Sequence, residues 1–176
     1  MNISVGNSRD LLASFKKVTN KHDLDKVVQI TDSIWNEYYI PIFGKDQVDY
    51  MLHNVFTRKA LLAKIKHEGL QYFLIEYASK DIGYLGLKIR EEDVLITNLY
   101  LSPKHRGLSI GRKAVTMVQA IAKKKGKKVI TARVHKENLE SIIACYRLGF
   151  EKTGEVCRSV GGAYVMDDLV MQTSVD

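Results

Sequence analysis

A glycine-bearing turn between an apolar strand pattern and a long helical pattern constrains this chain more than any other segment. Residues 98–111 read Asn-Leu-Tyr-Leu-Ser-Pro-Lys-His-Arg-Gly-Leu-Ser-Ile-Gly, and Ile110 opens the helical pattern. The first N–H groups of a helix have no partner within it and lie at the positive end of its dipole. Such a turn can bind an anion. The segment also carries Lys104, His105 and Arg106. We therefore expect a ligand with phosphate groups at this turn.

The apolar periodicity on either side of this turn predicts an α/β fold. Three strands joined by hairpins form an antiparallel meander over 71–78, 82–90 and 94–101. Further strands are expected at 15–19, 129–134, 150–158 and 163–171. Helical spacing covers 20–39, 46–55, 59–67, 110–122 and 138–148, with breaks at Pro41 and Gly44. Runs of strands with helices on the faces indicate one mixed sheet.

The length of 176 residues favours a single domain. We expect a flexible N-terminal tail over 1–13, the domain over 14–172 and a short C-terminal tail over 173–176. No apolar run is long enough to predict a membrane span, and no signal peptide is visible. The two cysteines lack metal-binding spacing, so we expect reduced thiols in the cytoplasm and no bound metal.

A net charge of +7 leaves nucleic acid open as a partner. Much of the excess lies in one lysine run at 123–128, which also suits the solvated C-terminal end of a helix closed by Gly126. The aromatic stacking motifs of the common RNA-binding modules are absent from the sequence. We therefore do not expect nucleic acid or a membrane as the partner.

Two segments resemble the GNAT superfamily of N-acetyltransferases. Arg106-Gly-Leu-Ser-Ile-Gly111 is similar to the family's acyl-CoA pyrophosphate loop, Arg/Gln-x-x-Gly-x-Gly/Ala. The segment from Asn138 through Ala144-Cys-Tyr-Arg-Leu-Gly-Phe150 resembles the downstream block, which ends in Tyr-x-x-x-Gly-Phe. The order of elements matches over about 14–172. Ser109 stands where the family has its first glycine; its hydroxyl can cap the helix or contact a phosphate.

The resemblance implies a GNAT-like fold, a mixed and mostly antiparallel sheet of about 6–7 strands with helices on both faces. It also implies acetyl-CoA as cosubstrate, a direct transfer to a primary amine, and a homodimer. The strand over 99–101 would pair with the pantetheine arm, and the Leu99 N–H would stabilise the oxyanion. The expected cofactor-binding residues are Leu99, Tyr100, Leu101, Arg106, Gly107, Leu108, Ser109, Ile110, Gly111, Arg112, Asn138 and Tyr146.

The catalytic groups follow from the same resemblance. Tyr146 matches the tyrosine that protonates the leaving thiolate, although a tyrosine there could also simply pack on the core. Asn138 would bind the pantetheine arm, cap the helix, or do both. No carboxylate lies near Asn98, so Glu76 and Glu37 are the candidates for the base, with a water chain as the alternative.

The acceptor end is the least defined by the sequence. Aromatic rings with acids suit a cationic amine, either a polyamine, another small amine or a polypeptide amine. The candidates are Trp35, Glu37, Tyr38, Tyr39 and Tyr84, followed by Phe43, Tyr164, Asp167 and Asp168; several of them could equally be core or dimer contacts. The missing carboxylate and Ser109 also leave open a non-catalytic acyl-CoA sensor on the same fold.

Overall fold

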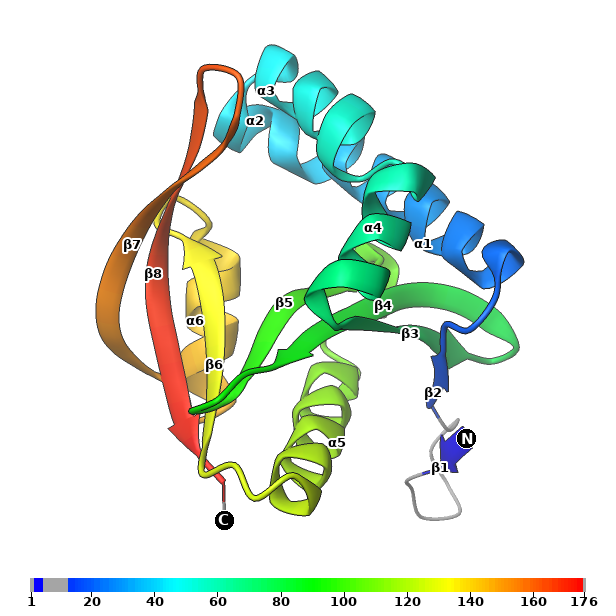
Figure 1. Ribbon diagram of the computed structural model, residues 1–176, viewed down its shortest axis with the longest axis vertical. Coiled ribbons are helices and arrows are strands. Elements are labelled where there is room, and N and C mark those ends of the chain that lie inside the picture. Colours follow the sequence, from blue (N-terminus) through cyan, green and yellow to red (C-terminus); the bar gives the residue numbers. More distant parts are fainter. Residues whose placement is uncertain (1, 5–12, 176) are drawn as a thin grey trace.

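The computed structural model describes residues 2–4 and 13–175, which form one eight-stranded sheet with helices on both faces (Figure 1). The strands lie in the order β1-β2-β3-β4-β5-β6-β8-β7. Their bounds are β1 Asn2–Ser4, β2 Ser14–Lys17, β3 Leu70–Tyr77, β4 Lys80–Ile89, β5 Val94–Leu101, β6 Val129–His135, β7 Glu151–Gly161 and β8 Tyr164–Ser174. Only β5 and β6 run parallel. The expected mixed, mostly antiparallel sheet is confirmed, with β1 as an additional edge strand.

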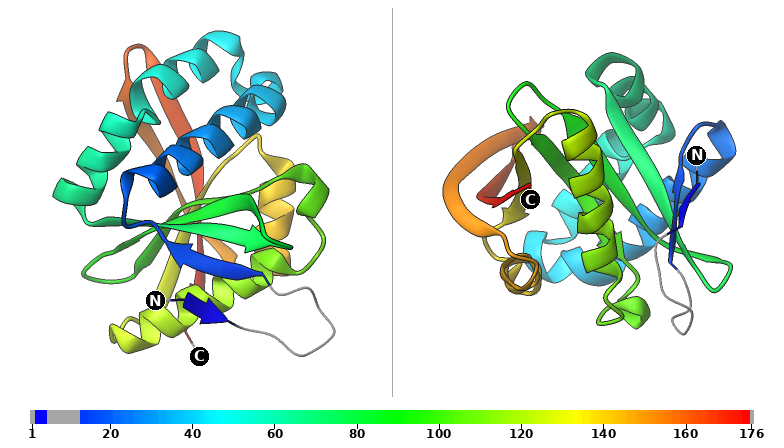
Figure 2. Two further views of the ribbon diagram at one scale, coloured as in Figure 1. Left: turned by 90° about the vertical axis from the view of Figure 1, so that its right-hand side faces the viewer. Right: turned by 90° about the horizontal axis from the view of Figure 1, so that it is seen from below.

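The helices form two layers. The N-terminal layer comprises α1 Lys21–Ile34, a π-helical turn Trp35–Tyr39, α2 Ile40–Phe43, α3 Lys45–Tyr50, a second π-helical turn Met51–Val55 and α4 Arg58–Glu68. The other comprises α5 Ile110–Lys124 and α6 Leu139–Arg147, after a short 3₁₀ turn at Pro103–His105. Figure 2 shows α1 lying over the β3–β4 hairpin and α5 crossing the opposite face. Each layer has its own apolar core against the sheet. No helix within the described ranges has the length and apolarity to span a membrane.

The predicted helix break at Pro41 is wrong. Helical backbone continues from α1 through the π-helical turn into α2 and ends at Gly44, whose φ of 78° needs a glycine. Proline lacks an N–H and crowds the carbonyl four residues earlier in a helix. At Pro41 the ring lies in the first turn of α2, directly after the wider π turn, where these costs are small.

β5 and β6 separate after only three paired residues. The pairs are Val94↔Ile130, Leu95↔Thr131 and Ile96↔Ala132. Both strands run on, and Figure 1 shows them diverging from this common end. A β-bulge lies at the branch point, because Thr97 has no partner on β4. Bulges bend a strand, and here the bend leaves a V-shaped opening in the sheet.

Gly86 on β4 makes room for this bulge. A Cβ at Gly86 would lie 2.7 Å from Thr97 Oγ1 and 3.0 Å from Asn98 Oδ1. Such distances are shorter than van der Waals contact, so a side chain here would displace β5. The bulge therefore depends on a glycine on the neighbouring strand.

The predicted tails contain parts of two strands. Within 1–13 the structure describes β1, which pairs antiparallel with β2, and Ala13, which is buried in the core. Residues 1 and 5–12 of that tail lie outside the described residues. In the predicted tail at 173–176, β8 continues to Ser174 and remains paired with β6.

Candidate active site

A cavity of about 1050 Å³ passes through the opening between β5 and β6. Its lining residues come from both faces of the sheet. We call the part lined by residues 106, 107 and 109–112 and by α6 the turn end. We call the part lined by the N-terminal helical layer and by β4, β6, β7 and β8 the helical end. Leu99, Tyr100 and Leu101, which the sequence predicts to bind the cofactor, line the cavity between these two ends.

The turn end matches the anion site expected at the start of α5. Gly107 and Ser109 have positive φ values of 79° and 59°. The Lys113 N–H donates to the Ser109 carbonyl at 3.1 Å, so the N–H groups of Ile110, Gly111 and Arg112 precede the first helical hydrogen bond. These three residues line the cavity. The free helix start that an anion requires is therefore present.

Three details at this end differ from the sequence-based expectation. The Arg106 N–H donates to the Pro103 carbonyl at 3.2 Å, so this group is already occupied. Leu108 is exposed and does not line the cavity. The Ser109 side chain makes no capping hydrogen bond to α5, although its backbone takes the left-handed conformation that glycine prefers.

The Arg106 side chain connects three elements at the rim of the cavity. Its Nη1 donates to Glu140 Oε2 at 3.0 Å, and its guanidinium lies 4.6 Å from the centre of the Tyr38 ring. The Tyr38 hydroxyl lies 3.0 Å from the same Glu140 oxygen and 3.1 Å from Asn138 Oδ1. Burial and the hydrogen bond to Glu140 raise the pKa of Tyr38, so this phenol is neutral and can donate.

Asn138 is the N-cap of α6. Its Oδ1 accepts from the Ser141 N–H at 3.1 Å, and its Nδ2 donates to the Tyr39 hydroxyl at 3.4 Å. The residue is 3 % exposed and lines the cavity. The capping interpretation is therefore confirmed, and the same amide links α6 to the aromatic residues of the helical end.

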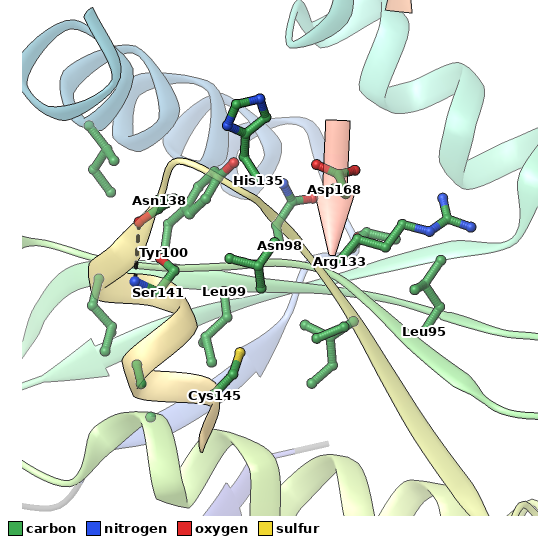
Figure 3. Close-up of a pocket in the computed structure, with 18 of the residues that line it drawn as sticks. Leu95, Asn98, Leu99, Tyr100, Arg133, His135, Asn138, Ser141, Cys145 and Asp168 are labelled. Carbon is green, nitrogen blue, oxygen red and sulfur yellow. Dashed lines mark hydrogen bonds between the residues drawn. The ribbon is translucent and has the colours of Figure 1, made fainter. Parts of the chain in front are cut away.

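The assignment of Tyr146 as the acid does not agree with the structure. Tyr146 is 52 % exposed and is not among the residues that line the cavity. The reason is visible in the sequence, because Tyr146 stands three residues before Gly149 whereas the family's pattern has four. The residue four positions before Gly149 is Cys145, which lines the cavity. In Figure 3 its sulfur points from α6 towards Leu99.

Neither candidate base lies at the cavity. Glu37 is exposed on the π-helical turn after α1, and Glu76 lies on β3 opposite Ser14 and Asp81; neither lines the cavity. Tyr84, predicted to contact the acceptor, is fully buried in the core instead, where its hydroxyl accepts from Thr31 Oγ1 at 2.8 Å. For Glu76 and Tyr84, strand alternation alone could not distinguish these positions from those that face the opening.

Aromatic rings line the helical end of the cavity. Trp35 stacks on Tyr39 with ring centres 4.7 Å apart, and both stack on Phe43. Tyr100 of β5 lies 5.8 Å from Tyr39. Burial raises the pKa of Tyr39 and of Tyr100, so both phenols are neutral near pH 7. Trp35, Tyr38 and Tyr39, which the sequence predicts to contact the acceptor, line the cavity, and the buried Trp35 Nε1 makes no hydrogen bond of ordinary geometry with a described residue.

Most of the charged residues at the helical end were not predicted from the sequence. Arg133 and His135 of β6 lie beside Asp168 of β8 and Asn98 of β5 in Figure 3. Asp168 is 2 % exposed and accepts from Arg158 at 2.6 and 3.2 Å. Alternate residues of a strand share a face, so the sequence could have placed Arg133 and His135 on the same face of β6. Among the residues that the structure describes, no three His, Cys, Asp or Glu side chains are grouped to hold a metal ion.

Comparison with known proteins agrees with this fold. The profile of the acetyltransferase (GNAT) family matches residues 28–150. A spermidine N(1)-acetyltransferase of Thermoplasma acidophilum is 25 % identical over 133 residues, covering 73 % of this chain and 83 % of the relative. The crystal structure of PaiA N-acetyltransferase from Thermoplasma acidophilum in complex with coenzyme A has a TM-score of 0.71 at 20 % identity, over 91 % of this chain and 98 % of that one. A GCN5-related N-acetyltransferase from Rhodopseudomonas palustris has a TM-score of 0.75 at 14 % identity, over 96 % and 99 %.

Proposed function

Because this chain belongs to the acetyltransferase (GNAT) family, we propose that it transfers the acetyl group of acetyl-CoA directly to a primary amine. The observation that carries this proposal is the continuous cavity through the opening between β5 and β6. A donor can enter from the turn end and an acceptor from the helical end, so the two meet at β5 without a covalent enzyme intermediate.

The donor would bind along the unpaired edge of β5. After Ile96, β5 pairs with no described strand on the β6 side, so its backbone groups there can pair with the amides of pantetheine, apart from the Leu101 carbonyl, which accepts from Arg106 Nε at 3.4 Å. The pyrophosphate would lie against the N–H groups at the start of α5, beside Arg112. This position brings the thioester towards Leu99.

The reaction needs two proton transfers. The amine loses a proton, its nitrogen attacks the thioester carbon, the C–S bond breaks, and CoA leaves as a thiolate that takes up a proton. The products are the amide and free CoA thiol, with one proton released when the amine enters as an ammonium ion. A backbone N–H at Leu99 would stabilise the oxyanion by about 3 kcal/mol.

We assign the proton donor to Cys145 rather than to Tyr146. Cys145 lines the cavity and points towards Leu99, while Tyr146 does not line it. Burial raises the pKa of the Cys145 thiol to about 11, so the group is protonated at neutral pH. A protonated thiol near the departing sulfur can donate its proton to the CoA thiolate, and Cys145 then regains a proton from solvent, into which the amine has released one.

The relative named spermidine N(1)-acetyltransferase supports a small amine as acceptor in preference to a polypeptide. A location in the cytoplasm and a homodimer stay predictions from the sequence.

The test is the release of CoA thiol from acetyl-CoA with a panel of polyamines, amino acids, amino sugars and peptides. We expect release that depends on an added amine. Tight acetyl-CoA binding without turnover over the whole panel would instead favour the acyl-CoA sensor.

A further inference from the structure

The helical end of the cavity carries more positive than negative charge. The cations that line it come from α4, β4, the residue after β4, β6 and β7, and the carboxylates from α4 and β8. The cations are Lys64, Lys88, Arg90, Arg133 and Arg158, and the carboxylates are Glu68 and Asp168.

The buried carboxylates near this end each hold an arginine. Asp168 accepts two hydrogen bonds from Arg158, both on Oδ2. Asp93, which does not line the cavity, accepts from Arg90 at 2.5 and 2.6 Å. Glu68, the last residue of α4, is exposed. Arg158 and Arg90 thus offset the two buried carboxylates, and Asp168 Oδ1 is the acceptor that these bonds leave open.

Arg133 is the arginine that these pairs leave over; Lys64 and Lys88 have no ion pair with a described residue either. Arg133 is half-buried, lines the cavity, and has no hydrogen bond or ion pair with any described side chain. Burial and the positive charges of Arg158 and Arg90 lower its pKa, while Asp168 and Asp93 oppose them. Lys64 is also affected, since burial and Arg158 lower its pKa while Glu68 opposes them.

A second donor at this end is weakly satisfied. The indole Nε1 of Trp35 is buried, lines the cavity and makes no hydrogen bond of ordinary geometry with a described residue. The Tyr100 hydroxyl still interacts with it, since Trp35 lowers the pKa of that phenol. The unpaired guanidinium of Arg133 is therefore the observation that favours a ligand with acceptor oxygens.

On these grounds, and resting on the amine acetylation proposed above, we propose that the acceptor carries an anionic group, a carboxylate or a phosphate, which binds Arg133. Arg133 follows Ala132, the last β6 residue paired with β5, and so lies beside the point where the opening begins. An anion held there leaves the amine of a compact molecule free to extend along β5 towards Leu99. A polyamine would place like charge against Arg133 instead.

The test uses acceptor pairs that differ only in the anion. One pair is a dipeptide and its C-terminal amide, the other is glucosamine 6-phosphate and glucosamine, and spermidine is added alone. The measured quantity is kcat/KM for the acceptor at saturating acetyl-CoA, from CoA thiol release. We expect the anionic member of at least one pair to be preferred by about tenfold or more, the size of one charge-assisted hydrogen bond. Preference in the first pair assigns a carboxylate, and in the second a phosphate.

The variant Arg133→Gln should remove this preference by raising KM for the anionic member, and Arg133→Lys should restore part of it. Because the substitution relieves repulsion among like charges, we expect the protein to fold. Lys125→Gln, which removes one positive charge at the end of α5 away from the cavity, is the matched control and should keep the preference.

Titration calorimetry with CoA-loaded protein separates this inference from the proposed function. If no amine is acetylated but an anionic member binds more tightly than its partner and Arg133→Gln abolishes the difference, the inference stands and the proposed function fails. Equal kcat/KM within both pairs, a preference for spermidine, or no binding of any anionic member would overturn the inference.

Discussion

The Arg106 guanidinium and the Glu140 carboxylate form an ion pair of 3.0 Å that joins the turn before α5 to the first turn of α6. Both residues line the turn end of the cavity, where the proposed ligand brings phosphate charge. The carboxylate thus lies close to the place where an anion is expected, and it holds a cation that could otherwise contact that anion.

Glu140→Gln should therefore strengthen CoA binding. Removing the carboxylate frees Arg106 and removes a repulsive charge, which should lower the Kd of CoA about twofold to fivefold, as expected for an exposed ion pair. Titration calorimetry measures the change, with Glu137→Gln as a control on the preceding loop, since Glu137 does not line the cavity. Weaker binding in Glu140→Gln would mean that the pair instead holds Arg106 in its binding position.

Ser109 lies in the left-handed backbone region without a compensating capping bond. For a residue with a Cβ this conformation costs about 1 kcal/mol, so Ser109→Gly should raise the thermal unfolding midpoint by a few degrees. Ser109→Ala keeps the Cβ and should leave the midpoint unchanged. Equal effects of the two variants would show that the hydroxyl group, and not the backbone, determines the stability of this turn.

Cys145 and Tyr146 offer a direct comparison of two adjacent side chains on α6. Cys145→Ala should lower kcat by about tenfold or more if the thiol returns the proton to CoA. Tyr146→Phe should leave kcat unchanged, because this ring does not line the cavity. Steady-state thiol release measures both. A larger loss of kcat in Tyr146→Phe would return the acid role to the tyrosine.

Gly86→Ala should damage the bulge at Thr97. The new Cβ would lie 3.0 Å from a Tyr72 ring carbon, in addition to its close contacts with Thr97 and Asn98, so a small shift cannot relieve all three contacts. We expect a loss of about 1–3 kcal/mol in the free energy of unfolding, together with a loss of acetyl transfer. The control is Gly154→Ala on β7, where a Cβ meets nothing within 4 Å. Full activity in Gly86→Ala would show that the bulge does not position the site.

Asp93 should contribute to the loss of unfolding free energy at low pH. Burial would raise its pKa, but hydrogen bonds from Arg90 and Thr131 outweigh that effect and hold the pKa below its usual value. A depressed carboxylate pKa stabilises the fold above the unfolded-state pKa, about 4, and this contribution disappears as the pH falls through the folded-state pKa. Asp93→Asn should therefore lower stability at pH 7 and flatten its decline below pH 4, as measured by urea unfolding. An unchanged decline would assign the acid sensitivity to other carboxylates.

The strands, the main helices and the anion turn were predictable because each depends on local signals. The turn at 107–111 combines glycine, basic residues and the start of apolar helical spacing, and the structure has the helix start where these signals predict it. Ser109 was recognised as occupying a glycine position, and its positive φ agrees with that reading. The family resemblance then supplied the fold into which these elements assemble, which local signals cannot give.

The errors have two origins. Tyr146 was matched to the family's pattern one residue out of register, which the spacing to Gly149 could have revealed, and one residue on a helix turns a side chain by about 100°. The other side chains have roles that depend on non-local geometry. Arg133 and Arg158 were not predicted as site residues, because their positions at the opening result from the divergence of β5 and β6. Asp168 was named among the acids of the acceptor end, but its pairing with Arg158 could not be seen before β7 and β8 were in register.

The short pairing between β5 and β6 also divides the polypeptide into two contiguous pieces. Every described strand on one side of the opening precedes residue 102, and every one on the other side follows residue 128. A ligand that spans the opening would contact both pieces. Because it would bind the assembled pieces more tightly than the separate ones, it would stabilise their association. Cutting the chain in the loop after α5 should then yield two fragments whose reassociation is driven by the donor substrate.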